Sequence, residues 1–499
     1  MGLKNTALFF LAILLPLHIS PSSSSSVFSS ETSGFATSVL DVSASLEQTR
    51  QVLFFTPKRF PPSPQQEQEQ TRTAPTSSSS FSVRLHPRDA VFNPHHRSYK
   101  SLVLARLDHD TARVKSLVTK LQVALSHNNM SDLRPTETEL QPEALSTPVS
   151  SGTGQGSGGY LARVGIGQPP QQFYMLLDTG SDVNWLQSKP CVDCYQQSDP
   201  IFDPSESSSY SLVTCDSQEC SALDTSACLY DKCLYQVSYG DGSFTVGEYI
   251  TETLTFDNSS SLYGVAMGCG HVNEGLFAGA AGLLGLGGGS PSLTSQIKAS
   301  SFSYCLVDRD SNKSSTLDFN YSALPGHSVT VPLLRNPKMN TFYYVNLTGI
   351  SVGGRMLPLP ASTFALNDSG RGGVIVDSGT TITRLRRLAY YLLRDEFRIQ
   401  TVNLRPSTTG DTFFDTCYDF SSLTSVTVPT LSFHFSGGKS LRLPAKNYLI
   451  PVESNGTFCF AFAPSSSSSL SIIGNVQQQG TRVSFDIANS IVGFSPDNC

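Results

Sequence analysis

In the stretch YMLLDTGS, residues 174–181, an apolar run ends at the carboxylate of Asp178. An ionised Asp in a protein interior loses its hydration, so it needs a compensating role as a cap, a turn or a chemical group. A second stretch, VIVDSGTT at residues 374–381, repeats the order of apolar run, Asp, Ser or Thr, Gly, and Ser or Thr. Turn chemistry remains the simple alternative for each copy, but two copies after apolar strands favour a shared chemical role.

Two such strand ends can bring a pair of carboxyl groups together. Carboxyl groups within hydrogen-bonding distance cannot both ionise cheaply, so they share one proton and titrate as a pair. The ionised member can deprotonate a water molecule, and the protonated member can donate to a carbonyl oxygen. The pattern therefore predicts hydrolysis by an activated water, without a covalent intermediate.

The two motifs resemble the signature of the pepsin-type aspartic proteases. They stand 199 positions apart (377 minus 178), which leaves one lobe for each motif. The resemblance covers about residues 155–499 and implies a mainly β, bilobal pepsin-like acid protease fold with a cleft between two β lobes. It implies that Asp178 and Asp377 are catalytic, that Thr179 and Ser378 cross-brace the two loops, that Ser181 and Thr380 bond the outer carboxylate oxygens, and that Gly180 and Gly379 allow close backbone approach.

A glycine turn between two apolar segments predicts a hairpin over residues 234–246, LYQVSYGDGSFTV. It resembles the flap that covers the cleft in this family, with Tyr239, Gly240 and Asp241 near its tip. Trp185 matches the aromatic residue whose indole N–H pairs with the flap tyrosine, although simple core packing would also explain it. The segments LLG at 283–285 and IIG at 472–474 resemble the strands behind the two catalytic loops.

The first 150 residues differ in character from the rest of the chain. Residues 1–22 read as a secretory signal peptide, with one Lys before a short apolar stretch. We interpret residues 23–150 as a propeptide, in which 23–80 are disordered, 81–126 form a basic inhibitory segment and 127–150 form a linker. Within the basic segment, residues 99–125 predict an amphipathic helix. Its cations would neutralise the acidic cleft; a merely solvated basic face is the alternative.

Residues 151–335 are expected to form the N-terminal protease lobe, and residues 336–499 the C-terminal lobe. Short β-like segments dominate both, and residues 388–399 give the best helical pattern there. A Cys-rich insert at 188–233 resembles that of the plant nepenthesin-type, or atypical, aspartic proteases. All 11 Cys follow residue 190. In an exported protein, such cysteines more often form disulfides than a zinc site, which the CxxC of residues 191–194 would otherwise suggest.

The cysteine count is odd because this chain has Ser188 where those relatives have a Cys. The resemblance implies five disulfides and leaves Cys191 free or joined to an external thiol. The implied pairs are Cys194–Cys269, Cys215–Cys233, Cys220–Cys228, Cys305–Cys499 and Cys417–Cys459.

Several classes of function are disfavoured by the sequence. The formal net charge of −6 gives no sign of nucleic-acid binding. There is no HExxH-type metal motif, and the glycine string at 282–289 lacks the Gly-Lys-Ser/Thr of a phosphate loop, so we expect neither metal nor cofactor. No later apolar stretch is long enough to span a membrane. Candidate glycosylation sites, given an export signal, are Asn129, Asn258, Asn312, Asn320, Asn346, Asn367 and Asn455.

The sequence thus predicts an aspartic endopeptidase, made as a secreted zymogen and active at acidic pH. We expect a monomer of the secretory pathway (extracellular, endoplasmic reticulum or vacuole) that takes polypeptide substrates and pepstatin-like inhibitors. One rival is a catalytically silent pepsin-like binder that inhibits other hydrolases, but both Asp motifs are intact. A second rival is a two-carboxylate glycosidase, which leaves the flap hairpin unexplained.

Overall fold

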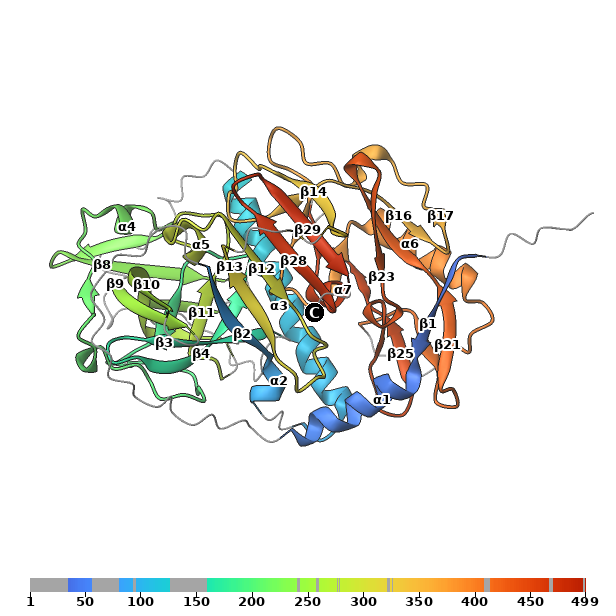
Figure 1. Cartoon of the computed structure of the whole chain (residues 1–499), viewed down its shortest axis with the longest axis horizontal. Helices are drawn as coiled ribbons and strands as arrows, with labels where there is room; N and C mark the ends of the chain where they lie inside the picture. Colours follow the sequence, from blue (N-terminus) through green and yellow to red (C-terminus); the bar gives the residue numbers. More distant parts are fainter. Residues whose placement is uncertain are drawn as a thin grey trace, which may run out of the picture. The chain divides into compact units, whose positions relative to one another are not determined.

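The computed structural model describes residues 35–55, 80–92, 96–125 and 159–499, apart from 240–242, 257–259, 276, 278, 321–323, 325, 408–412, 466–469 and 497–498. The chain divides into two units, Met1–Gly34 and Phe35–Cys499, and every described residue lies in the second. This second unit is mainly β and contains the two lobes that the resemblance implies (Figure 1). The expected signal peptide and linker lie outside the described residues.

The N-terminal lobe consists of β-strands with two one-turn helices, α4 (Gln218–Ser221) and α5 (Leu293–Gln296). Its strand β4 is buried on both faces from Phe173 onward, which is why it reads as a continuous apolar run rather than an alternating one. The strands are β3 (Tyr160–Ile166), β4 (Gln171–Asp178), β5 (Trp185–Gln187), β6 (Ser211–Leu212), β7 (Ser226–Leu229), β8 (Lys232–Ser238), β9 (Phe244–Phe256), β10 (Ser260–Glu274) and β11 (Gly282–Gly285).

A continuous antiparallel sheet joins the two lobes. Its strands, in order, are β2 (Phe81–Pro87), β13 (Ser315–Phe319), β12 (Ser301–Cys305), β28 (Thr481–Asp486), β29 (Ile491–Pro496) and β14 (Val329–Leu334). Phe302 of β12 stacks on Phe485 of β28, with ring centroids 4.6 Å apart. Strands from both halves of the chain therefore share one core.

The C-terminal lobe holds the remaining strands and the amphipathic helix α6 (Arg387–Gln400), which confirms the helical pattern predicted at 388–399. The one-turn helix α7 (Asn475–Gln478) follows its last inner strand. Its strands are β15 (Tyr344–Val345), β16 (Leu347–Val352), β17 (Arg355–Met356), β18 (Val374–Val376), β19 (Thr383–Leu385), β20 (Cys417–Asp419), β21 (Ser425–Pro429), β22 (Leu431–Phe435), β23 (Lys439–Leu443), β24 (Leu449–Pro451), β25 (Thr457–Phe460), β26 (Phe462–Pro464) and β27 (Ser471–Ile473).

The N-terminal segment is folded over part of the region predicted to be disordered (23–80), so that prediction is wrong for residues 35–55. There, β1 (Thr37–Asp41) pairs with β21, and α1 (Val42–Gln51) follows with Asp41 as its N-cap. Val42 and Val52 are fully buried. Leu40, Val42 and Leu46 are buried in a core shared with the C-terminal lobe, and this tertiary burial offsets the entropy lost when the segment becomes ordered.

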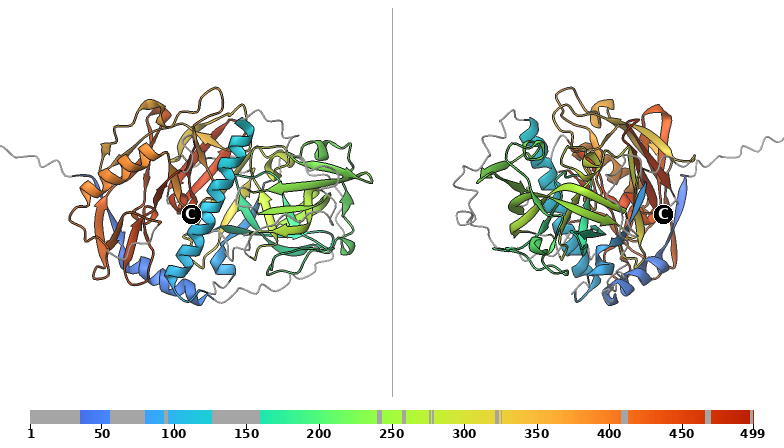
Figure 2. Two further views of the ribbon diagram at one scale, coloured as in Figure 1. Left: turned by 180° about the vertical axis from the view of Figure 1, so that it is seen from behind. Right: turned by 60° about the vertical axis from the view of Figure 1, so that its left-hand side comes forward.

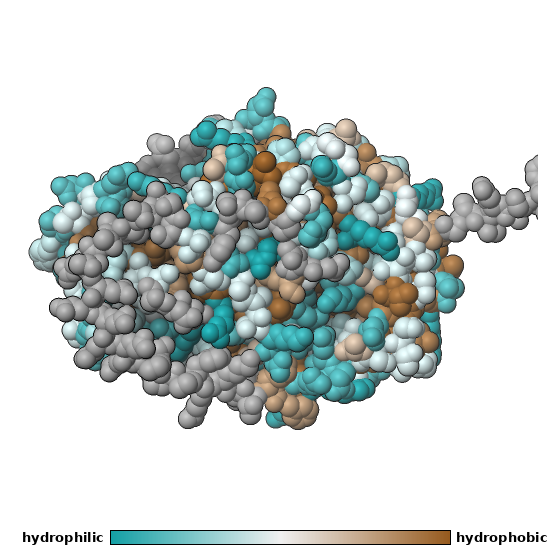
Figure 3. Space-filling model, in the orientation of Figure 1, coloured by the Kyte–Doolittle hydropathy of each residue, from teal (hydrophilic) through white to brown (hydrophobic). Residues whose placement is uncertain are grey.

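Helix α3 (Tyr99–Leu125) confirms the amphipathic helix predicted for the basic segment. It follows the short helix α2 (Arg88–Val91) and runs between the strands of the two lobes (Figure 2). Its apolar stripe, which includes Leu102, Leu117 and Leu121, is buried. On the face shown in Figure 3, hydrophobic residues of the described surface form only small patches among hydrophilic ones.

Two of the five predicted disulfides are present, and three are wrong. Cys305–Cys499 and Cys417–Cys459 form as predicted. In the insert, Cys215 pairs with Cys228 and Cys220 pairs with Cys233. The predicted pairs, Cys215–Cys233 and Cys220–Cys228, do not form. Burial accounts for the choice: Cys220 and Cys233 are both buried, whereas Cys228 is exposed and Cys215 is half-buried.

The unpaired cysteine is Cys269, not Cys191. Cys191 joins Cys194 instead of staying free, so the predicted Cys194–Cys269 bridge is wrong. Cys269 is fully buried on β10 and lies beside Leu186 of β5, which places its thiol near Ser188, the residue directly after β5. Burial raises the pKa of this thiol to about 12, and the nearby Ser188 hydroxyl acts in the opposite direction.

Candidate active site

The two Asp motifs lie together where two buried strands end. Asp178 is the last residue of β4, and Asp377 directly follows β18. Both residues are almost fully buried, at 3% and 0% exposure. Both carboxylates contact one nitrogen, Nη2 of Arg113, and the Asp377 Oδ1 distance is 3.3 Å. The structure thus brings together two acids from distant halves of the chain.

Each carboxylate is oriented by donors from its own loop. Ser181 Oγ donates to Asp178 Oδ2 at 2.6 Å, and Thr380 Oγ1 donates to Asp377 Oδ2 at 2.6 Å. The backbone N–H of Gly180 donates to Asp178 Oδ1 at 2.9 Å, and that of Gly379 lies 3.4 Å from Asp377 Oδ1. Each carboxylate therefore has one oxygen held by a hydroxyl and the other directed toward the facing loop.

The residue after each Asp reaches across to the opposite loop. The N–H of Ser378 donates to Thr179 Oγ1 at 2.9 Å, and the N–H of Thr179 donates to Ser378 Oγ at 3.2 Å. These are the positions at which the resemblance implies a cross-brace. The reciprocal pairing fixes the two loops relative to each other in a buried setting.

Parallel strands support both loops, at the segments LLG and IIG. Strand β11 pairs with β4 so that Gly285 lies opposite Asp178. Strand β27 pairs with β18 so that Ile473 lies opposite Val376. A Cβ at Gly285 would lie 2.4 Å from the Asp182 carbonyl oxygen, so this position requires glycine for close backbone contact.

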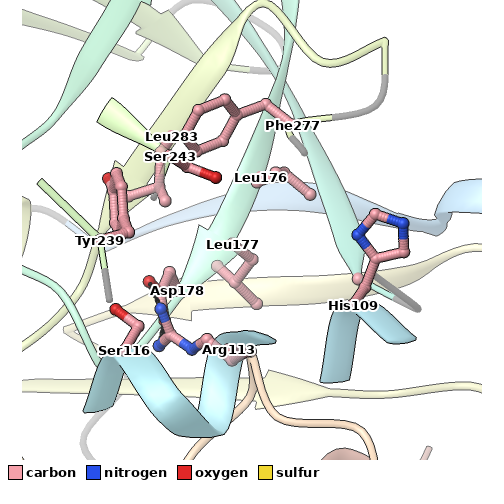
Figure 4. Close-up of a pocket in the computed structure, with 12 residues that line it drawn as sticks. His109, Arg113, Ser116, Leu176, Leu177, Asp178, Tyr239, Ser243, Phe277 and Leu283 are labelled. Atoms are coloured by element: carbon pink, nitrogen blue, oxygen red, sulfur yellow. Dashed lines mark hydrogen bonds and ion pairs between the residues drawn. The ribbon is translucent and has the colours of Figure 1, made fainter. Parts of the chain in front are cut away.

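The flap hairpin forms over the described strands, because Ser238 of β8 pairs with Phe244 of β9. Trp185, fully buried, donates its indole N–H to Tyr239 Oη at 3.1 Å, so it packs in the core and also binds the flap tyrosine. Gly240 and Asp241 lie outside the described residues. Tyr239, Phe277 and Leu283 line an apolar pocket that reaches Asp178 (Figure 4).

Arg113 of α3 occupies the space in front of the Asp pair. Its Nη1 donates to Asp178 Oδ2 at 2.8 Å, its Nη2 contacts Asp178 Oδ1, and its Nε lies 3.4 Å from Asp377 Oδ2. Figure 4 shows the guanidinium extending from the helix to Asp178. Burial lowers the pKa of Arg113, but the two carboxylates outweigh burial and hold the pKa above its ordinary value.

Further ion pairs join α3 to the protease lobes, and two of them are buried. Arg106 binds Asp310 of the loop after β12 at 2.8 Å, and it also binds Asp89 of α2. Asp110 binds Arg384 of β19. Sequence reasoning predicted a cation in the cleft but did not identify which residue supplies it.

A signal for these residues was present in the sequence. Positions 102, 106, 110, 113, 117 and 121 follow the helical spacing of the buried stripe, and three of them are charged. A charge within an apolar stripe requires a buried partner. Here Arg113 pairs with the two Asp residues of the cleft, whereas Arg106 and Asp110 pair with other buried charged residues.

The candidate glycosylation sites differ in exposure. Asn312, Asn367 and Asn455 are exposed, whereas Asn320 and Asn346 are half-buried. Asn320 Oδ1 also accepts the N–H of Ser300 at 2.9 Å. Asn129 and Asn258 lie outside the described residues.

Within the described ranges, there is no group of three or more His, Cys, Asp or Glu that could hold a metal ion. In the same part of the chain, no helix combines the length and apolar character needed to cross a membrane.

Comparison with family models places both lobes in known plant domains. Residues 160–319 match the model described as Xylanase inhibitor N-terminal, and residues 342–496 match Xylanase inhibitor C-terminal. At 19% identity, the chain is similar to the solved structure of edgp, with a TM-score of 0.56 over 68% of this chain and 92% of that one. Basic 7S globulin from soybean gives a TM-score of 0.55, also at 19% identity, over 68% of this chain and 93% of that one. These likenesses show the fold.

Curated relatives are more similar in sequence. The chain is 46% identical to Protein ASPARTIC PROTEASE IN GUARD CELL 2 of Arabidopsis thaliana, over 85% of this chain and 88% of that protein. It is 50% identical to Aspartyl protease family protein 2 of the same plant, over 84% and 86%. Aspartic proteinase nepenthesin-1 of Nepenthes gracilis is 42% identical, over 72% and 81%. The chain belongs to this family of plant aspartic proteases.

Proposed function

We propose that Asp178 and Asp377 carry out peptide-bond hydrolysis in this aspartic endopeptidase. The observation that supports the proposal is the convergence of both buried carboxylates on one Arg113 nitrogen. Once that guanidinium leaves, the same space can hold one water molecule between the two acids. One carboxyl then acts as base toward the water while the other donates a proton to the scissile carbonyl, and the roles reverse when the amine departs.

The substrate is a polypeptide that lies extended across the cleft beneath the Tyr239 hairpin. The pocket lined by Tyr239, Phe277 and Leu283 adjoins Asp178 and would accept an apolar side chain. Pepstatin-like inhibitors would occupy the same cleft. The enzyme acts as a monomer, since one chain supplies both Asp residues.

The full-length chain is a zymogen. Residues 23–150 form the propeptide, in which segment 81–126 inhibits by placing Arg113 on the Asp pair. Acid that neutralises Asp310 breaks the ion pair of this carboxylate with Arg106 on α3 and so loosens the segment. Cleavage in the linker 127–150 then releases the enzyme with its two lobes, 151–335 and 336–499. The disulfides, the signal peptide 1–22 and the exposed sequons favour the secretory pathway.

A peptide-cleavage assay tests this function. The purified chain is incubated with a denatured protein mixture across a range of pH, with and without pepstatin, and the new termini are identified by mass spectrometry. We expect cuts at acidic pH that pepstatin abolishes. A preparation that matures and binds pepstatin but makes no cuts would favour the silent binder instead; the intact Asp pair argues against that outcome.

A further inference from the structure

We propose that Arg384, with the backbone N–H groups of Thr381 and Ile382, forms a subsite that selects an acidic side chain of the substrate. The inference rests on the proposed function and adds a specificity to it. The three groups belong to the protease lobe and directly follow the catalytic loop that carries Asp377. In the full-length chain, the carboxylate of Asp110 on α3 occupies them.

The contacts of Asp110 define the subsite. Its Oδ1 accepts the N–H of Thr381 and, at 3.3 Å, that of Ile382; its Oδ2 accepts from Arg384 Nη2. Asp110 is fully buried, and Arg384 is 6% exposed. Two backbone donors and a guanidinium around one carboxylate make a specific acid-binding arrangement.

The arrangement loses its anion when the propeptide leaves. Arg384 forms its salt bridge with Asp110, and the guanidinium carbon lies 5.0 Å from the ring centre of Phe413. Arg384 Nε and Thr381 Oγ1 are buried without a hydrogen-bond partner among the described residues. A partly buried cation with spare donors favours a new carboxylate and disfavours Lys or Arg side chains.

The position of the subsite fits a peptide in the cleft. Asp110 precedes Arg113 by three residues on α3, which corresponds to about 4.5 Å along the helix axis. An extended peptide advances about 3.3 Å per residue. An acidic side chain at the Asp110 position would therefore stand one or two residues from the scissile bond, close enough to affect turnover as well as binding.

Matched peptides test the subsite in the matured enzyme. Each pair carries Asp or Asn at one position within three residues of the same apolar cleavage site, and kcat/KM is measured at about pH 5.5, above the ordinary Asp pKa of about 3.9. We expect one position at which Asp is preferred over Asn by about tenfold or more, as for a hydrogen bond to a charged group. At about pH 3, where the peptide Asp is largely protonated in solution, the preference should shrink.

The ratio of the two rates is then compared between variants, because a ratio does not depend on the fraction of folded enzyme. Arg384→Gln should bring the Asp/Asn ratio close to one, whereas Arg387→Gln, at an exposed Arg on α6, should leave the ratio unchanged. Wild-type enzyme that cleaves every peptide without an acid preference would overturn the subsite and leave the protease function standing. Wild-type enzyme that cleaves none of them would overturn the function itself.

Discussion

The N–H of Ser378 lies 2.9 Å from Thr179 Oγ1, and the N–H of Thr179 lies 3.2 Å from Ser378 Oγ. This reciprocal pair ties the loop of one lobe to the loop of the other, directly beside the two Asp residues. Removing one hydroxyl leaves a buried N–H without its partner, which costs about 1–3 kcal/mol. The pair should therefore govern both the stability of the cleft and the alignment of its carboxylates.

A double-mutant cycle with Thr179→Val and Ser378→Ala tests the brace. We expect each single variant to lower kcat by about tenfold through misalignment of the carboxylates, with a coupling energy of about 0.5–3 kcal/mol in unfolding. A matched cycle with Thr255→Val and Ser261→Ala, whose hydroxyls pair at 3.2 Å outside the cleft, should leave kcat unchanged. Equal effects of the two cycles on kcat would contradict the assigned role.

Arg113→Gln should relieve inhibition in the full-length chain. The variant removes the cation that both carboxylates bind, and breaking such a pair weakens the docking of α3 by about 3 kcal/mol. We expect the uncleaved variant to bind pepstatin and hydrolyse a peptide at a pH where the wild-type chain does neither. Lys115→Gln, at an exposed position on the same helix, is the control and should stay inhibited. An uncleaved Arg113→Gln chain that is as inactive as the wild type would contradict the inhibitory role of Arg113.

Acid should weaken the second anchor of α3 as well. Burial raises the pKa of Asp310, but Arg106 and Arg309 outweigh burial and hold it below the ordinary value of about 3.9. The contribution of Asp310 to helix docking is therefore complete above that ordinary value and is lost as the pH falls through the lowered pKa.

Asp310→Asn should accordingly shift the midpoint of maturation to higher pH, because the variant has already lost the charge that acid must neutralise. The midpoint is read from the appearance of the mature chain on gels after incubation across a pH series. Asp368→Asn, at an exposed Asp, should leave the midpoint where it is. A midpoint that stays fixed, or moves to lower pH, in Asp310→Asn would argue against this anchor.

The sequence predicted the features that depend on local pattern. The apolar runs before Asp178 and Asp377, the glycine turn of the flap and the spacing of α3 each contain their own signal, and the structure has a strand end, a hairpin and a helix at these places. The choice of disulfide partners within the insert depends on which cysteines are buried together. That property appears only when α4 packs against β8.

The N-terminal segment also depends on a tertiary contact that the local sequence does not reveal. In residues 37–54, β1 gains a full set of strand partners from β21, and Val42 and Val52 become buried. The wider region 23–80 is rich in Ser, Pro, Gln and Thr, which predicted disorder. The partner that stabilises residues 37–41 lies almost 400 residues away, at Ser425–Pro429.

Ser188→Cys should convert the buried free thiol into a sixth disulfide. Ser188 directly follows β5 and lies near Cys269 of the neighbouring strand β10. We expect the number of free thiols in the unfolded, non-reduced protein to fall from one to zero, and the free energy of unfolding to rise by about 2–4 kcal/mol. A count of two free thiols would show that the two side chains do not meet.

The central claim is that Asp178 and Asp377 act as one catalytic unit, and the kinetics of matured Asp178→Asn, Asp377→Asn and the double variant test it most directly. Each single variant should lose at least about 10²- to 10⁴-fold in kcat/KM, because each carboxyl serves as base or acid. The double variant should be hardly worse than either, since residues that act as a unit are not additive. Asp193→Asn, at an exposed Asp, should keep the wild-type rate. Substantial turnover by a correctly folded single variant, or losses that multiply in the double variant, would contradict the account.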